Sequence, residues 1–209
     1  MADRATVSWA AAVARFMKLA MKPVDESTAP SPFDSTAAAV IDLAAYAERL
    51  ATYTYCSGAV HTAALVYVDR LCRYSAVTDS QIVLTDRSAH RLYGACLYVA
   101  AKFWEDCTMP HAFWAKAAGL CPSELQKLEV TVLSGLKFQL DIKPSDGRKY
   151  QQAVSVAEAR RARSLGLVPV KAACAGVEDR IMRAKIDSCN ASTCPGTPAS
   201  SVGVASPVA

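Results

Sequence analysis

Apolar residues recur every three or four positions along most of this chain, a period typical of helices with one buried face. Segment 4–22 shows it first, with apolar positions Trp9, Val13, Phe16 and Ala20. Residues 23–32 form a linker of proline and small polar residues. We expect 4–22 to form an extra helix packed on the following domain. A mitochondrial presequence is the alternative, because the segment is basic and amphipathic, although Asp3 counts against it.

Five further helical segments are predicted between Phe33 and Ile142. The first begins after the cap candidates Asp34 and Ser35, and its stripe is Val40, Leu43, Ala47 and Leu50. The second, 59–74, is apolar on nearly every side and should be central and buried. After a loop at 75–87, the third, 88–104, carries small residues that let helices approach closely. These are Gly94, Ala95, Cys96, Ala100 and Ala101.

The last two of these five segments have clear end signals. The fourth is short, because Pro110 suits its first turn and Gly119 suits the position just past a helix end. The fifth begins at Pro122, with Glu124 favoured by the positive end of the helix dipole. Its stripe is Leu125, Leu128, Val132 and Leu136. Consecutive helices with short loops predict one compact all-α domain.

The chain after residue 142 has a weaker pattern. Tyr150, Val154 and Ala157 predict another helix that ends near Gly166, and Val177 with Ile181 predict a last one. The uncharged remainder should be disordered. The predicted parts are an N-terminal helix and linker, a helical domain, a helical extension and a tail: 1–32, 33–142, 143–187 and 188–209.

The charge distribution argues against nucleic-acid binding. Residues 33–142 contain nine Lys or Arg against eleven Asp or Glu, whereas residues 143–209 contain ten against five. A nucleic-acid-binding domain carries its basic residues on the folded core. The cluster Arg160, Arg161 and Arg163 is therefore interpreted as a solvated helix face, rather than as a nuclear signal.

Metal, membrane and enzyme chemistry are not expected. The eight cysteines include no Cys-x-x-Cys pair, and Cys72 and Cys96 lie in apolar helical patterns, which favours reduced packing thiols in a cytoplasmic or nuclear protein. Cys107 and His111 lie four apart, but nothing nearby completes a zinc site. No apolar run approaches the ~20 residues that span a bilayer. Without a phosphate loop or nucleophile elbow, we expect no catalytic site and no cofactor.

Three stretches, taken together, resemble a cyclin box. They are Leu65-Val66-Tyr67-Val68-Asp69-Arg70-Leu71 in the second segment, His90-Arg91-Leu92 with residues 99–106 in the third, and residues 124–129 with Leu133, Leu136, Phe138 and Leu140 in the fifth. The loop and the His-Arg-Leu opening are similar to the phosphate-regulatory cyclins of yeast and the P- or U-type cyclins of plants. The resemblance covers residues 33–142. It implies an all-α fold: a five-helix cyclin box with an additional N-terminal helix and one or two C-terminal helices.

The resemblance implies a regulatory subunit that binds and allosterically activates a cyclin-dependent protein kinase, with no small-molecule substrate. The implied kinase-binding residues are Lys102, Phe103, Glu129, Leu133, Phe138 and Leu140. The structural signature residues are Asp69, Arg70, His90 and Arg91. Lys102 and Glu129 would touch the end of the movable regulatory helix of the kinase. The alternatives are a plain salt bridge between these two helices and, for the apolar residues, core packing.

The chain also departs from the pattern of other cyclins. In many of them the equivalent of Asp69 pairs with an arginine on the first helix, where this chain has Val40, so Arg49 or Arg73 would substitute. The Met-Arg-Ala-Ile-Leu docking patch of cell-cycle cyclins is missing, which puts that docking in doubt. The alternative function is a cyclin-fold adaptor of the transcription machinery that binds protein or DNA, a class that normally has two boxes and a basic surface.

Three dipeptides form minimal sites for proline-directed kinases. They are Ser31-Pro32, Thr197-Pro198 and Ser206-Pro207. Phosphorylation by the bound kinase is a hypothesis that these dipeptides motivate.

Overall fold

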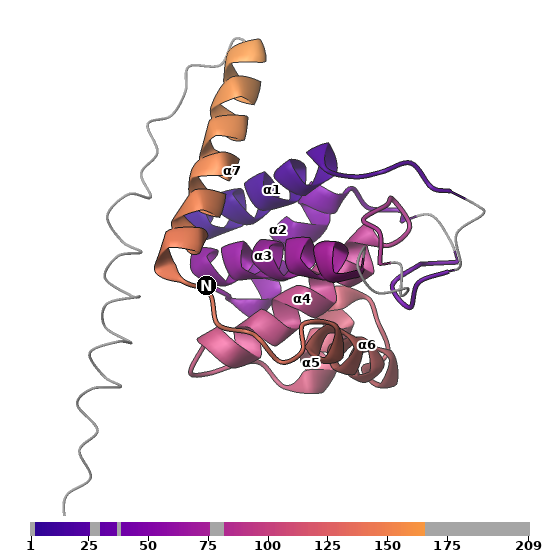
Figure 1. Cartoon of the computed structure of the whole chain (residues 1–209). Helices are drawn as coiled ribbons and strands as arrows, with labels where there is room; N and C mark the ends of the chain where they lie inside the picture. Colours follow the sequence, from indigo (N-terminus) through magenta and orange to yellow (C-terminus); the bar gives the residue numbers. More distant parts are fainter. Residues whose placement is uncertain (1–2, 26–29, 37–38, 76–81, 166–209) are drawn as a thin grey trace, which may run out of the picture. The chain divides into compact units, whose positions relative to one another are not determined.

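The computed structural model describes residues 3–25, 30–36, 39–75 and 82–165. All regular structure within these ranges is helical, in seven elements (Figure 1). They are α1 (Arg4–Leu19), α2 (Leu43–Thr54), α3 (Gly58–Ser75), α4 (Ala89–Trp104), α5 (His111–Ala118), α6 (Pro122–Gly135) and α7 (Pro144–Ser164). The predicted all-α fold is confirmed, with one helix before the five box helices and one after them. The helix predicted near Val177 and the tail 188–209 lie outside the described residues.

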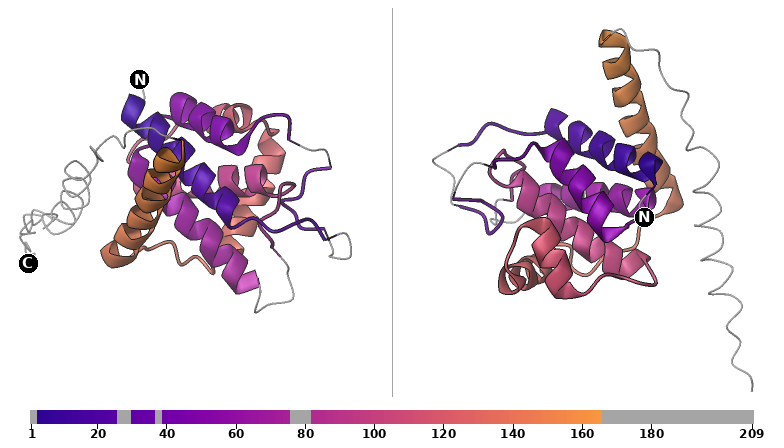
Figure 2. Two further views of the ribbon diagram at one scale, coloured as in Figure 1. Left: turned by 90° about the horizontal axis from the view of Figure 1, so that it is seen from above. Right: turned by 180° about the vertical axis from the view of Figure 1, so that it is seen from behind.

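The centre of the fold is α3, which packs against α1, α4, α6 and α7 (Figures 1 and 2). Side chains on every face of α3 are buried, among them Val60, Ala64, Tyr67 and Leu71. This confirms the prediction that the helix at 59–74 is central. Burying one large aliphatic side chain contributes roughly 1.5–3 kcal/mol, so the all-round apolar surface of α3 fixes its place in the core.

The additional N-terminal helix packs on the domain, as predicted. One face of α1 is buried against α2 and α3, and it includes Ala10, Val13, Ala14 and Met17. At the edge of this face the Trp9 indole nitrogen donates a hydrogen bond of 3.1 Å to the Thr62 hydroxyl on α3. Buried indole N–H groups normally need such a partner, so this bond fixes how α1 lies across α3.

The predicted start of the first box helix is wrong. The helix α2 begins at Leu43, where the Asp42 carboxylate caps it by accepting from the Ala44 amide at 2.9 Å. Val40, expected on the buried stripe, precedes the helix and is fully exposed. Asp34 and Asp42 have the same intrinsic capping preference, so local sequence does not decide between them. Asp42 also forms an ion pair with Lys18 of α1, a tertiary contact that favours the later start.

Small residues and turn residues act as predicted in the other helices. A methyl group on Gly94 of α4 would lie 2.6 Å from the Tyr46 hydroxyl of α2, so glycine permits this close approach. Gly119 follows α5 with a φ of 71°, a left-handed conformation that glycine adopts without strain. The helix α6 begins at Pro122, as its position in the sequence indicates.

Candidate functional site

Lys102 and Glu129, the two charged residues that the cyclin resemblance singles out, lie together. Lys102 is in the last turn of α4, Glu129 is in the middle of α6, and the ammonium is 2.5 Å from Oε1 of the carboxylate. The lysine side chain is 47% exposed and the glutamate side chain 14%. The hydrogen bond to Glu129 raises the pKa of Lys102, which keeps the ammonium charged. The structure therefore contains the interhelix ion pair that the sequence allowed for.

The Lys102 ammonium lies over the ring of Tyr98, which is in turn held by His111. Lys102 Nζ lies 5.3 Å from the centre of the Tyr98 ring, a cation–π distance. The Tyr98 hydroxyl is 3.0 Å from Nδ1 of His111, and Nε2 of His111 is 2.8 Å from the Pro122 carbonyl oxygen. A carbonyl only accepts, so Nε2 carries a proton and donates. This chain of contacts joins α4, α5 and the start of α6 at the level of Lys102.

The four apolar residues implied by the resemblance fall into two groups. Phe103 and Phe138 are 47% and 70% exposed. Leu133 and Leu140 are partly buried and pack against the core, so both contribute to the interior of the fold. Val130, which was not among the predicted site residues, is exposed next to Glu129 on α6. Its exposure could have been predicted from the sequence, because Val130 lies off the buried stripe of α6 and so faces outward.

Phe138 lies in a strained turn after α6. Lys137 and Phe138 have φ values of 52° and 57°, in the left-handed region that disfavours residues with a Cβ. Backbone hydrogen bonds close the turn, with the Phe138 amide donating to the Leu133 carbonyl at 2.9 Å. Two consecutive residues of this type cost on the order of 2 kcal/mol or more, so other contacts must hold the segment.

The signature of α3 provides these contacts. The Tyr67 hydroxyl donates to the Leu140 carbonyl at 2.6 Å, and Arg70 Nη1 donates to the carbonyls of Gln139 and Asp141 at 3.0 Å each. These three bonds, which we call the α3 clamp, hold the backbone on both sides of Leu140. Arg70 therefore supports the segment that carries Phe138.

The α3 clamp is also connected to α4. The Trp104 indole nitrogen donates to the Tyr67 hydroxyl at 3.0 Å, so this hydroxyl accepts one bond and donates another. The Phe103 ring meets the Trp104 ring edge to face, with centres 5.1 Å apart. Phe103 and the Phe138 segment are thus positioned by one network that passes through Tyr67. This role of Tyr67 and Trp104 was not predicted from the sequence.

Asp69, next in the signature, holds α7. Its carboxylate pairs with Arg73 one turn later, at 2.9 Å, and accepts a hydrogen bond from the Tyr150 hydroxyl of α7. Of the two substitutes considered for the missing arginine, Arg73 is the one that pairs. Arg49 instead donates to the Lys116 carbonyl at 3.2 Å. Val40 cannot mark the usual arginine position, because it is not in a helix.

His90 and Arg91 connect α4 to the chain before α2 and to α6. His90 Nε2 lies 2.8 Å from the Ile41 carbonyl oxygen, and Arg91 forms an ion pair with Glu124 in the first turn of α6. Partial burial lowers the pKa of His90. Both residues lie in the first turn of α4 and hold it to neighbouring segments, whereas Lys102 lies in its last turn.

Metal and thiol chemistry have little support in the described ranges. No group of three His, Cys, Asp or Glu within them could hold a metal ion. The five cysteines of these ranges are free. Cys96 is buried in the core and Cys72 is partly buried against it, and this burial raises the pKa of the Cys72 thiol to about 11. None of the helices in these ranges is both long and apolar enough to cross a membrane.

The sequence comparisons all point to one family. The family model described as Cyclin matches residues 4–140, a range that includes α1. Cyclin-U4-1 of Arabidopsis thaliana is 30% identical over 138 residues, which cover 66% of this chain and 66% of that protein. Cyclin-U4-2 of the same plant is 30% identical over 129 residues, covering 62% and 58%.

A rice relative matches a shorter stretch. Cyclin-P3-1 of Oryza sativa subsp. japonica is 34% identical over 97 residues, which cover 46% of this chain and 39% of that protein. The chain thus spans at most 66% of the length of these three relatives.

Proposed function

Because residues 4–140 match the family model, the chain belongs to the cyclin family, and we propose that it binds and activates a cyclin-dependent protein kinase. Family membership supports a regulatory role. The observation that carries the proposed contact is the ion pair between Lys102 and Glu129, exposed at the lysine and flanked by exposed Phe103. The alternative role, an adaptor of the transcription machinery, is not favoured by the comparisons.

Lys102 and Glu129 can each form further hydrogen bonds to a second protein. A lysine ammonium has three donors and a carboxylate about four lone-pair sites, and their mutual contact uses one of each. The remaining groups can bind amides and carbonyls at the end of a helix of the kinase without reading its sequence closely. Because each residue already holds the other in place, little side-chain entropy remains to be lost on binding.

The energetic role of the pair differs between the free and the bound chain. As an exposed salt bridge, the pair contributes about 0–1 kcal/mol to stability. In a desolvated interface, truncating one partner costs about 2–5 kcal/mol of binding free energy. The proposal therefore requires a variant that loses the kinase and keeps its fold.

Activation follows from selective binding. The cyclin binds the kinase conformation whose regulatory helix is turned in and whose lysine–glutamate ion pair is assembled. It shifts the population of that conformation only by its differential affinity for it. No catalytic group of the cyclin takes part.

Copurification followed by a kinase assay tests the proposal. The double variant Lys102→Ala/Glu129→Ala should recover at least about tenfold less active kinase than the wild type, with an unchanged circular dichroism spectrum. The matched control is Lys18→Ala, which removes another interhelix ion pair whose lysine side chain is 43% exposed. Equal recovery of active kinase by the double variant and the control would remove the basis for this site.

A further inference from the structure

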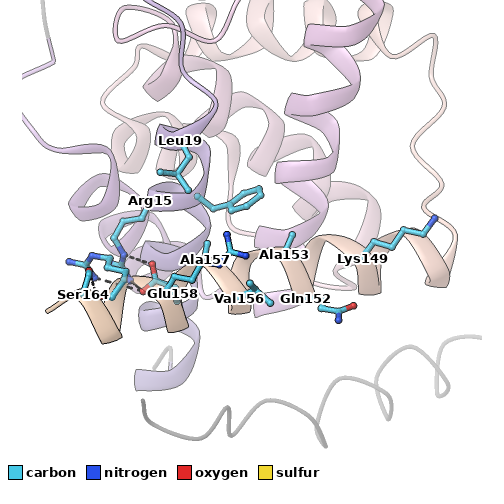
Figure 3. Close-up of a pocket in the computed structure, with 12 residues that line it drawn as sticks. Arg15, Leu19, Lys149, Gln152, Ala153, Val156, Ala157, Glu158 and Ser164 are labelled. Atoms are coloured by element: carbon cyan, nitrogen blue, oxygen red, sulfur yellow. Dashed lines mark hydrogen bonds and ion pairs between the residues drawn. The ribbon is translucent and has the colours of Figure 1, made fainter. Parts of the chain in front are cut away.

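A groove of about 860 Å³ runs between α1 and α7 (Figure 3), and neither Lys102 nor Glu129 lines it. Phe16 and Leu19 line it from α1, and Ala153, Val156 and Ala157 line it from α7. Leu19 is 75% exposed, and Val156 is also exposed. The three α7 residues are spaced i, i+3 and i+4, so they present one continuous apolar strip to the groove.

The rim of the groove is basic. Four cationic side chains line it (Arg15, Lys149, Arg160 and Arg161) against a single carboxylate, that of Glu158. Arg15 Nε and Nη2 each donate to one oxygen of Glu158 at 2.8 Å, and Arg161 Nη1 lies 3.8 Å from Oε2 of the same carboxylate. The carboxylate is therefore paired with two arginines, and its bidentate bond to Arg15 braces α7 against α1. Lys149 pairs at 3.1 Å with Asp146, which is not among the residues that line the groove.

We propose that this groove binds an acidic amphipathic helix of a partner protein. The lining from Lys149 to Ser164 corresponds to about 22 Å of helix axis, enough for a partner helix of about 15 residues. Apolar side chains of that helix pack on Leu19 and Val156, and its carboxylates pair with Arg160, Arg161 and Lys149. An amphipathic helix in an apolar groove is a common mode of peptide recognition.

Charge distinguishes this occupant from the remainder of the chain itself. Residues 166–209 contain four Lys or Arg and three Asp or Glu, so they supply no net negative charge to complement the rim. A flat anionic bilayer would be attracted by the same arginines, but the apolar strip lies in a concave surface between two helices. A narrow acidic helix reaches this strip more readily than a bilayer does.

Two labelled peptides of about 18 residues test the proposal with the full-length protein. Both carry leucine at i, i+3, i+4 and i+7; one has glutamate at the remaining positions and the other lysine. Fluorescence anisotropy should show at least tenfold tighter binding of the acidic peptide. Val156→Glu and Arg160→Glu/Arg161→Glu should each weaken that binding tenfold or more. Arg163→Glu, a charge reversal on the same helix outside the groove lining, should leave it unchanged.

Other outcomes would overturn the proposal. Equal binding of the two peptides, or binding insensitive to Val156→Glu, would show that the groove does not select an acidic helix. If truncation after Leu165 tightened peptide binding tenfold, the occupant would be the chain's own C-terminal segment. If vesicles of phosphatidylserine bound the protein through Val156 and the acidic peptide did not, the occupant would be a membrane.

Discussion

Replacing Tyr67 with phenylalanine removes one hydroxyl and leaves its ring in the core. That hydroxyl accepts from the Trp104 indole at 3.0 Å and donates to the Leu140 carbonyl at 2.6 Å. It links Trp104, whose ring meets Phe103, to the backbone two residues after Phe138. The proposed docking surface consists of Lys102, Glu129, Phe103 and Phe138, and Tyr67 is buried beneath it. Burial raises its pKa to about 12, so it is a neutral donor at physiological pH.

The magnitude follows from the two bonds lost. A neutral hydrogen bond contributes a net ~0.5–1.5 kcal/mol, so Tyr67→Phe should lower the free energy of unfolding by about 1–3 kcal/mol. Without Tyr67, only Arg70 of the α3 clamp holds the strained turn at Lys137 and Phe138. Re-ordering this turn on docking should cost about 1–2 kcal/mol, which raises the Kd for the kinase about five- to thirty-fold.

The control is Tyr46→Phe, because the Tyr46 hydroxyl also donates to a distant backbone carbonyl, that of Ala118, at 3.1 Å. Urea unfolding gives the stability of both variants, and surface plasmon resonance with the copurified kinase gives the Kd. Tyr46→Phe loses one such bond and should lower the free energy of unfolding by about 0.5–1.5 kcal/mol. We expect weaker kinase binding for Tyr67→Phe alone. Should both variants bind the kinase equally well, the network through Tyr67 would have no positioning role.

The remaining predictions concern stability. Burial lowers the pKa of His61 from 6.5 to about 3, so the unfolded chain takes up a proton that the folded chain does not. Neutral His61 therefore contributes fully to the free energy of unfolding above pH 6.5, and that free energy falls by about 2 kcal/mol at pH 5. Urea unfolding of His61→Leu at both pH values should lack this decrease. The same pH dependence in wild type and variant would refute it. Gly94→Ala places a methyl group against the Tyr46 hydroxyl and should cost about 1–3 kcal/mol, seen as a lower Tm; an unchanged Tm would contradict it. Lys137→Gly relieves a positive φ and should raise the Tm; a lower Tm would show that the turn is not strained.

The helices that were predicted correctly have strong local signals. The all-round apolar pattern of α3 and the turn residues Gly119 and Pro122 act within a few positions, so the sequence alone reveals them. The start of α2 was missed because Asp34 and Asp42 are equally good caps. The choice depends on Lys18, which is distant in the sequence.

The site was predictable only in part, for a similar reason. The cyclin resemblance pointed to Lys102 and Glu129, and the fold brings them together. The α3 clamp could not be predicted, because Tyr67 and Arg70 bind backbone carbonyls about 70 residues away, and any residue supplies a carbonyl. The positive φ of Phe138 had no signal either, since glycine or asparagine normally marks that conformation.

Titration of the copurified kinase with purified cyclin, with substrate phosphorylation as the readout, tests the proposed docking surface most directly. We predict that Lys102→Ala/Glu129→Ala raises the concentration for half-maximal activation about thirty-fold or more, with the same maximal activity at saturation. Lys18→Ala should shift it less than about twofold, because that pair only joins two helices of the cyclin. Coinciding activation curves for the double variant and the wild type would contradict the account.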